Sequence, residues 1–122
     1  MKSVEDIRNI LSGCIGTETY YRVFPGIDSV VFTDGVKVMA EECEAYWLIN
    51  AIASYQCEEK IKDEPFQVWT LEMLEGRKAI LKADDGNGNI LATQEIPFTD
   101  FPLPEGIKIY LTNGTLLLPS EY

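Results

Sequence analysis

The sequence contains no histidine among its 122 residues, has few bases and lacks a long apolar segment. Histidine is the usual base that activates a cysteine or serine nucleophile, so its absence argues against the common nucleophilic enzymes. The three cysteines, Cys14, Cys43 and Cys57, are odd in number and widely spaced, which predicts reduced thiols rather than a disulfide framework. A zinc site built on them would need a carboxylate as its fourth ligand, and we expect no metal or other cofactor.

The shortage of bases leaves a formal net charge of −10, from 20 acids and 10 bases. Nucleic-acid-binding proteins usually need a basic stripe to contact phosphates, and docking on anionic lipid also needs positive charge. The negative net charge argues against both. No apolar run approaches the roughly 20 residues of a membrane span. Acids occupy the N-terminal region where a signal peptide would be apolar. We therefore expect a cytoplasmic protein that contacts neither nucleic acid nor membrane directly.

The sequence does contain enough apolar material for one folded domain. Hydrophobic residues make up 46% of the chain and charged residues 25%, which is typical of a soluble globular protein. A chain of this length supports a single core, so we predict one domain over residues 1–122.

Residues 33–56, TDGVKVMAEECEAYWLINAIASYQ, have the pattern of one long amphipathic helix. Their apolar side chains recur at helical spacing along one broad face. In an alternative, residues 34–35 form a tight hairpin turn and residues 36–38 form a strand, so that the helix starts later. Both arrangements keep residues 45–55 helical, and we favour the long helix.

The remaining segments predict a short helix and several strands. The short helix runs from an N-cap at Ser3 to a stop signal at Gly13. Residues 20–24 and 30–32 have strand composition and predict a hairpin. Further strands are predicted by period-two patterns and turn signals at residues 66–75, 77–84, 90–98, 107–112 and 115–118. The fold class is therefore α+β, with an antiparallel sheet of about five to seven strands, a meander plus hairpins, packed on one main α-helix.

Six blocks of the sequence have a familiar combination of residues. They are GTETYY (16–21), FTDGVKVMAEE (32–42), AYWLINAIASYQ (45–56), EPFQVWTL (64–71), TDFPL (99–103) and LTNGTLLLPSEY (111–122). Together they resemble the DUF6876 family of small uncharacterised bacterial and phage proteins. The resemblance implies a single intact domain and an origin in mobile elements, which favours a role in host interaction. It supplies no activity, cofactor or catalytic residue.

The segment DDGNGN has a spacing that is found in calcium-binding loops. Asp85, Asn87 and Asn89 alternate as the first three ligands of such a loop do. The position that requires glycine is Ile90, however, and the position that requires a bidentate acid is Ile96. Asp-Gly and Asn-Gly steps supply the positive φ of tight turns, so we expect a hairpin loop here.

Acids are concentrated in one third of the chain. Between residues 18 and 59, eight acids stand against Arg22 and Lys37, which gives a local net charge of −6. The eight acids are the candidate partner-binding residues Glu18, Asp28, Asp34, Glu41, Glu42, Glu44, Glu58 and Glu59. If the main helix buries Trp47 and Leu48, its outer face becomes a negative ridge that can occupy a basic channel on a partner. The simpler interpretation of these carboxylates, including any pair suited to acid–base catalysis, is a solvated helix face.

The six tyrosines cannot all be buried in so small a domain. Tyrosine suits protein interfaces, including that of a homodimer, because it offers apolar area and a polar tip. We predict a non-enzymatic acidic binding protein, of the kind that a phage or mobile element uses as an inhibitor by mimicking nucleic acid toward a basic host protein surface. The alternative is a small structural or oligomeric domain without an inhibitory role, and the third is an enzyme of unrecognised type.

Overall fold

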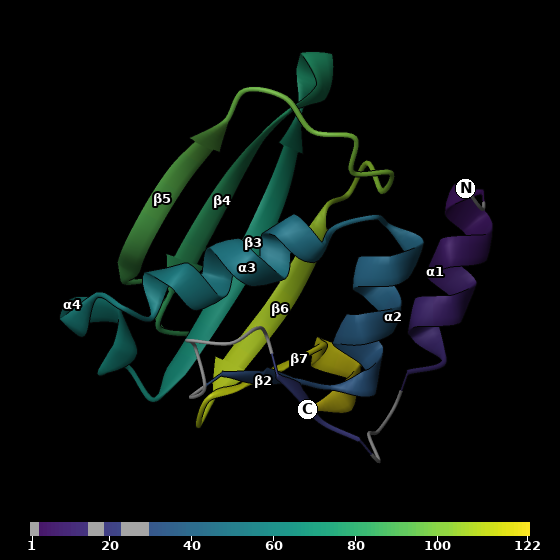
Figure 1. The fold of residues 1–122 in the computed structure, drawn as a ribbon. Coiled ribbons are helices and arrows are strands. Elements are labelled where there is room, and N and C mark those ends of the chain that lie inside the picture. The colour runs from purple at the N-terminus through teal and green to yellow at the C-terminus, as the bar shows by residue number, and fades with distance from the viewer. Residues whose placement is uncertain (1–2, 15–18, 23–29) are drawn as a thin grey trace.

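The fold is a seven-stranded sheet with helices packed on it, shown in Figure 1. The computed structural model describes residues 3–14, 19–22 and 30–122. The helices are α1 (Val4–Ser12), α2 (Asp34–Glu42), α3 (Tyr46–Tyr55) and α4 (Glu59–Lys62), with 3-10 turns η1 (Glu75–Arg77) and η2 (Pro119–Glu121). The strands are β1 (Tyr21–Arg22), β2 (Val31–Phe32), β3 (Phe66–Leu74), β4 (Lys78–Asp84), β5 (Ile90–Ile96), β6 (Ile107–Thr112) and β7 (Thr115–Leu117). The predicted α+β class is confirmed.

The strands lie in the order β1-β2-β7-β6-β3-β4-β5. The strands predicted after residue 65 are all present, and β3, β4 and β5 form the expected meander. The hairpin of β1 with β2 is also present, although its connection lies outside the described residues. One pair departs from the antiparallel prediction, because β2 runs parallel to β7. This pairing joins segments that lie far apart in the chain.

One face of the sheet carries the core. Trp69 and Leu71 of β3 and Leu81 of β4 are almost fully buried on the faces that their period-two patterns predict. They belong to one cluster with buried residues of α1, α2 and α3. In Figure 1, α3 crosses in front of β3 and β4, while α1 and α2 lie beside it toward β6 and β7. The helices thus cover the apolar face, as a layered domain requires.

The prediction of one helix over residues 33–56 is wrong, because the chain breaks between α2 and α3. The alternative with a strand at residues 36–38 is also wrong, because these residues are helical in α2. Thr33 caps α2, and its hydroxyl oxygen accepts a hydrogen bond from the Val36 backbone N–H at 3.3 Å. On α3, Leu48 is buried as predicted, whereas Trp47 is only half-buried.

The connection between α3 and β3 contains the short helix α4. A buried glutamine, Gln67, ties the two helices to the sheet. Its Nε2 donates to Gln56 Oε1 at 3.0 Å and to the Ile61 carbonyl at 2.8 Å. Its Oε1 accepts from Trp69 Nε1 at 2.9 Å. A buried amide persists because its hydrogen-bonding groups are satisfied in this way.

The segment DDGNGN forms the predicted hairpin loop between β4 and β5. Both of its flanks are strands, and Gly86 and Gly88 have positive φ angles. The Asp85 carboxylate accepts hydrogen bonds from the Asn87 backbone N–H at 2.8 Å and from Asn89 Nδ2 at 2.8 Å. The hydrogen bond from the Asn89 side chain is the main cause that lowers the pKa of Asp85. The loop is therefore held together by its own side chains.

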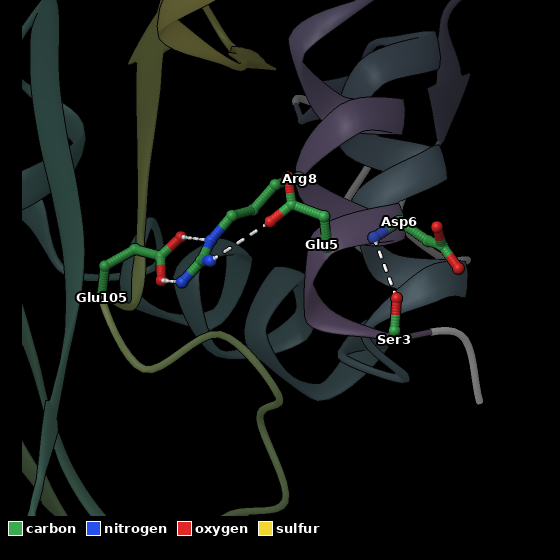
Figure 2. A network of polar contacts seen from close by, with 5 residues as sticks. All are labelled: Ser3, Glu5, Asp6, Arg8 and Glu105. Carbon is green, nitrogen blue, oxygen red and sulfur yellow. Dashed lines mark hydrogen bonds and ion pairs between the residues drawn. The ribbon is translucent and has the colours of Figure 1, made fainter.

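The N-terminal helix α1 is capped as predicted, since Ser3 Oγ accepts from the Asp6 backbone N–H at 3.1 Å. Figure 2 shows Arg8 reaching from α1 to Glu105, with its Nε and Nη2 at 2.8 and 2.6 Å from the two carboxylate oxygens. Hydrogen bonding to Arg8 lowers the pKa of Glu105 to about 2. This paired contact fixes α1 to the loop that precedes β6. Among the described residues, no helix is long and apolar enough to cross a membrane.

The burial of α3 predicts unequal effects for two neighbouring alanine substitutions. Ile52→Ala should lower the free energy of unfolding by about 2–5 kcal/mol, because Ile52 is fully buried and its removal leaves a cavity. Trp47→Ala should cost only about 1–2 kcal/mol, because that side chain is half exposed. Urea unfolding of both variants and the wild type measures this. Equal losses would contradict the orientation of α3.

Candidate functional site

The structure describes five of the eight candidate acids in full. Glu18 and Asp28 lie outside the described residues, and for Glu59 the structure describes the backbone alone, in α4. Asp34, Glu41 and Glu42 belong to α2, Glu44 lies in the turn after it, and Glu58 lies between α3 and α4. The single negative ridge was expected on one continuous helix, and the break between α2 and α3 divides that surface.

Asp34 is engaged in contacts that hold β1 against the start of α2. Its carboxylate accepts hydrogen bonds from the Tyr21 hydroxyl at 2.9 Å and from the Thr19 backbone N–H at 3.4 Å. The hydrogen bond to Asp34 raises the pKa of Tyr21. These contacts give Asp34 a structural role, so its charge is directed into the fold.

Glu41 and Glu42 are also partly engaged. Glu41 is exposed and forms an ion pair with Lys37, whose Nζ lies 3.4 Å from a carboxylate oxygen. The hydrogen bond to Glu41 raises the pKa of Lys37, and the same Nζ lies 4.9 Å from the centre of the Tyr21 ring. Glu42 is half-buried and has contacts of its own. The charge on the outer face of α2 is therefore partly offset.

Glu44 differs from the other acids in its backbone and its surroundings. Its φ is +52°, a left-handed conformation that glycine adopts easily and other residues adopt at a cost. The Ala45 backbone N–H donates to the Ala40 carbonyl at 2.8 Å, which is the closing hydrogen bond of a Schellman motif. Glu44 thus occupies the position where glycine is usual. Its side chain is exposed and takes part in no ion pair among the residues that the structure describes.

A groove of about 720 Å³ lies beside Glu44. Apolar groups line it at Met73 and Leu74 of β3 and at Phe101 and two prolines of the loop before β6. The other acids in its wall are Glu75 of η1 and Asp100 of that loop. We refer to this feature as the acidic groove, lined by Glu44, Met73, Leu74, Glu75, Arg77, Thr99, Asp100, Phe101, Pro102 and Pro104.

Three contacts stabilise the wall of the acidic groove that includes Arg77 and residues 99–101. Arg77 Nη1 lies 3.0 Å from Asp100 Oδ1, so one of the three acids is already paired. Thr99 is buried, its backbone N–H donates to the Arg77 carbonyl at 2.9 Å, and its hydroxyl oxygen accepts from the Phe101 N–H at 3.2 Å. These bonds fix the loop, which leaves Glu44 and Glu75 as the carboxylates open to a ligand.

The sequence does not predict the acidic groove, because its walls come from three separate segments. Glu75 and Asp100 lie outside the acid-rich third of the chain. The turn signal at Gly76 and the proline-rich stretch around residues 99–104 mark both segments as irregular, but neither signal indicates that they meet.

The helix α3 separates the remaining acids. None of its residues, YWLINAIASY, is charged. Glu44 precedes it and Glu58 follows it, and because a helix rises about 1.5 Å per residue, the ten residues of α3 place its two ends about 15 Å apart. The exposed face of α3 between them includes Tyr46, Asn50 and Ser54. The described candidate acids therefore fall into two groups, one before and one after an uncharged helix.

The three thiols differ in their surroundings. Cys43 is buried, and burial raises its pKa to about 12, which keeps it protonated and unreactive. Burial also raises the pKa of Cys14, which is half-buried, while Cys57 is exposed. All three cysteines are free, and no group of three metal-binding side chains occurs among residues 3–14, 19–22 and 30–122.

The left-handed conformation of Glu44 predicts an unusual effect of glycine. Glu44→Gly should raise the free energy of unfolding by about 0.5–1 kcal/mol, because the strain exceeds the added entropy of the unfolded chain. The matched substitution Glu41→Gly, inside α2, should lower it by about 1 kcal/mol. Urea unfolding compares the two variants. A similar loss in both would show that position 44 carries no backbone strain.

Comparison with known proteins gives one match. No curated protein and no solved structure matches the chain. A family model described as a family of unknown function, DUF6876, matches residues 5–122. This confirms the resemblance drawn from the six sequence blocks, and the match covers both α2 and all of the acidic groove. The protein belongs to the DUF6876 family.

Proposed function

We propose that the protein binds a basic surface of a partner protein and that the acidic groove is the centre of the contact. The observation that carries this proposal is Glu44, an exposed residue in a strained, left-handed backbone conformation that lines the groove. Strain of this kind is commonly found at functional positions. Glycine or asparagine would adopt this conformation at a lower cost, so a glutamate at this position lowers stability.

The acidic groove suits the chemistry of lysine and arginine side chains. Both have an aliphatic stem that packs on apolar surface and a charged head that seeks an acceptor. Met73, Leu74 and the two prolines offer the apolar surface, while Glu44 and Glu75 offer the carboxylates. Arginine can bond a carboxylate through two parallel N–H groups, which adds geometric specificity. A partner segment that carries arginine is therefore the favoured ligand.

The net charge of −10 supports the same proposal at longer range. A field of one sign steers an oppositely charged partner and speeds its association, and the effect falls as salt screens the charges. Glu41 and the half-buried Glu42 lie on α2 immediately before Glu44, so they extend the negative surface next to the groove.

We expect that removing negative charge from the acidic groove weakens binding of a basic ligand more than removing the same charge elsewhere. A short arginine-rich peptide should shift the backbone amide signals of Leu74, Arg77 and Asp100 in a heteronuclear NMR titration, with an affinity that falls as salt rises. Replacing both Glu44 and Glu75 by glutamine should weaken binding about tenfold, which corresponds to about 1.4 kcal/mol.

The matched control replaces two exposed acids away from the groove, Asp6 and Asp63, by asparagine. It changes the net charge by the same amount, so it should weaken binding by only a small factor. Equal weakening in both double variants would show that the peptide responds to total charge and that the acidic groove is not its site.

A more specific proposal is that the protein inhibits a nucleic-acid-binding host protein by mimicking nucleic acid, as a phage or mobile-element protein would. Mimicry requires the two acidic groups at the ends of α3 to act on one basic surface. The ten residues of α3 between them span about 15 Å, which corresponds to about four phosphates of one DNA strand at an axial rise of about 3.4 Å each. A partner that binds DNA along a channel of that length fits both groups.

Mimicry predicts competition. A host protein captured from lysate by the immobilised wild type should be released by duplex DNA as well as by salt, because both ligands occupy the same basic surface. The variant with glutamine at Glu44 and Glu58 should capture less of it. A captured protein that salt releases and DNA does not would exclude mimicry while leaving basic-partner binding in place.

A further inference from the structure

The strand β5 leaves one edge of the sheet open. It pairs with β4 along its length and, in the part of the chain that the structure describes, with no strand on its other side. The Tyr55 hydroxyl donates to Gln94 at 2.9 Å, and α4 lies near the same strand. These contacts cover the face of β5 that looks toward the helices. The backbone groups along its outer edge have no partner strand.

The open edge lacks the usual protection. Natural sheets guard their edges with lysines, prolines, very short strands or covering segments. The seven residues of β5, ILATQEI, contain no proline and one charge, Glu95. The register of β4 with β5 shifts between Ala83 and Asp84, so that Leu91 of β5 has no partner in β4, and this irregularity lies at one end of β5 only. The opposite edge of the sheet, β1, has two residues, so β5 is the edge that can accept another strand.

The apolar residues at the two ends of β5 are also exposed. Ile90 begins the strand and is 56% exposed, and Phe98, two residues after its end, is 61% exposed. Large apolar side chains exposed at both ends of an open strand indicate a surface that another chain covers.

The strand is complementary to itself. If two copies pair antiparallel about a two-fold axis at Thr93, all seven residues of each strand are matched. Ile90 of one copy then lies opposite Ile96 of the other, next to Phe98. Glu95 lies opposite Leu91, so no two acids come directly opposite each other. Like charges opposite each other would weaken a strand pair.

We propose that the protein forms a homodimer through antiparallel pairing of β5 with β5 of a second copy, centred on Thr93. The sheet then continues across the two-fold axis, and the open edges of both copies are satisfied by backbone hydrogen bonds. The interface uses none of the acids that line the acidic groove. The proposed dimer is therefore independent of the proposed binding of a basic partner, and an experiment can contradict one without contradicting the other.

Rising salt should affect dimer formation and binding of a basic partner in opposite directions. Each copy has a net charge of −10, so the two copies repel each other at low ionic strength. Rising salt screens this repulsion and should strengthen the dimer, whereas it should weaken binding of a basic partner. Sedimentation velocity over a range of protein concentrations, at low and high salt, measures the association constant of the dimer.

A matched pair of substitutions locates the interface. Thr93→Asp places two new carboxylates opposite each other at the axis and should reduce the dimer constant at least tenfold. Ser54→Asp adds the same charge on the exposed face of α3 and should leave the dimer nearly unchanged. Thermal unfolding followed by circular dichroism checks that both variants are folded.

Cross-linking tests the register even if Thr93→Asp proves unstable. In a Cys57→Ser background, Thr93→Cys should form a covalent dimer rapidly on oxidation, because opposed residues of an antiparallel pair lie about 4.5–5.5 Å apart, within disulfide range. Ser54→Cys in the same background should not. A wild type that stays monomeric at every concentration would overturn the proposal, as would a dimer in which the two cysteines react at equal rates.

Discussion

The break between α2 and α3 is the constraint on which the rest of the structure depends. One hydrogen bond, from the Ala45 N–H to the Ala40 carbonyl at 2.8 Å, closes the turn. It allows α2 to lie toward β7 while α3 crosses β3 and β4, so that two short helices cover a sheet that one straight helix would cover only in part (Figure 1). The buried side chains of both helices then share one core with Trp69 and Leu81.

Both ends of this two-helix layer are anchored by polar groups from distant segments. At the start of α2, Glu121 accepts from the Thr33 hydroxyl at 2.6 Å and from the Gly35 N–H at 3.2 Å. At the end of α3, the Gln56 and Gln67 amides exchange hydrogen bonds of 2.9 and 3.0 Å. A charged acceptor at a helix N-terminus is favourable, and a buried amide pair is tolerated only when it is satisfied. The acidic turn at Glu44 therefore projects from a fixed frame.

The sequence predicts the local features well because each depends on neighbouring residues. Period-two alternation locates β6 at residues 107–112, and the Asp-Gly and Asn-Gly steps identify the loop after β4. It does not predict the helix break, because Glu44 adopts a left-handed conformation without the glycine that normally marks one. Nor does it predict the parallel pairing of β2 with β7 or the meeting of Glu44 with Glu75 and Asp100, because these depend on tertiary packing. Single-residue patterns carry no information about such contacts.

The two proposed surfaces adjoin at the same end of the sheet. Leu74 lines the acidic groove and also the hollow formed by Ile80, Glu95 and Ile96 at the end of β5. In an antiparallel dimer that end of one copy lies against the beginning of β5 in the other, so the two grooves are offset along the strands by roughly the length of a seven-residue strand, about 23 Å. The strands β4 and β5 of both copies separate them further across the sheet. A rigid pair of acidic grooves at a fixed spacing can engage two basic sites on one partner, and the second contact then forms at high effective concentration. Weak individual contacts, of the size expected for exposed carboxylates, would suffice for a stable complex under that arrangement.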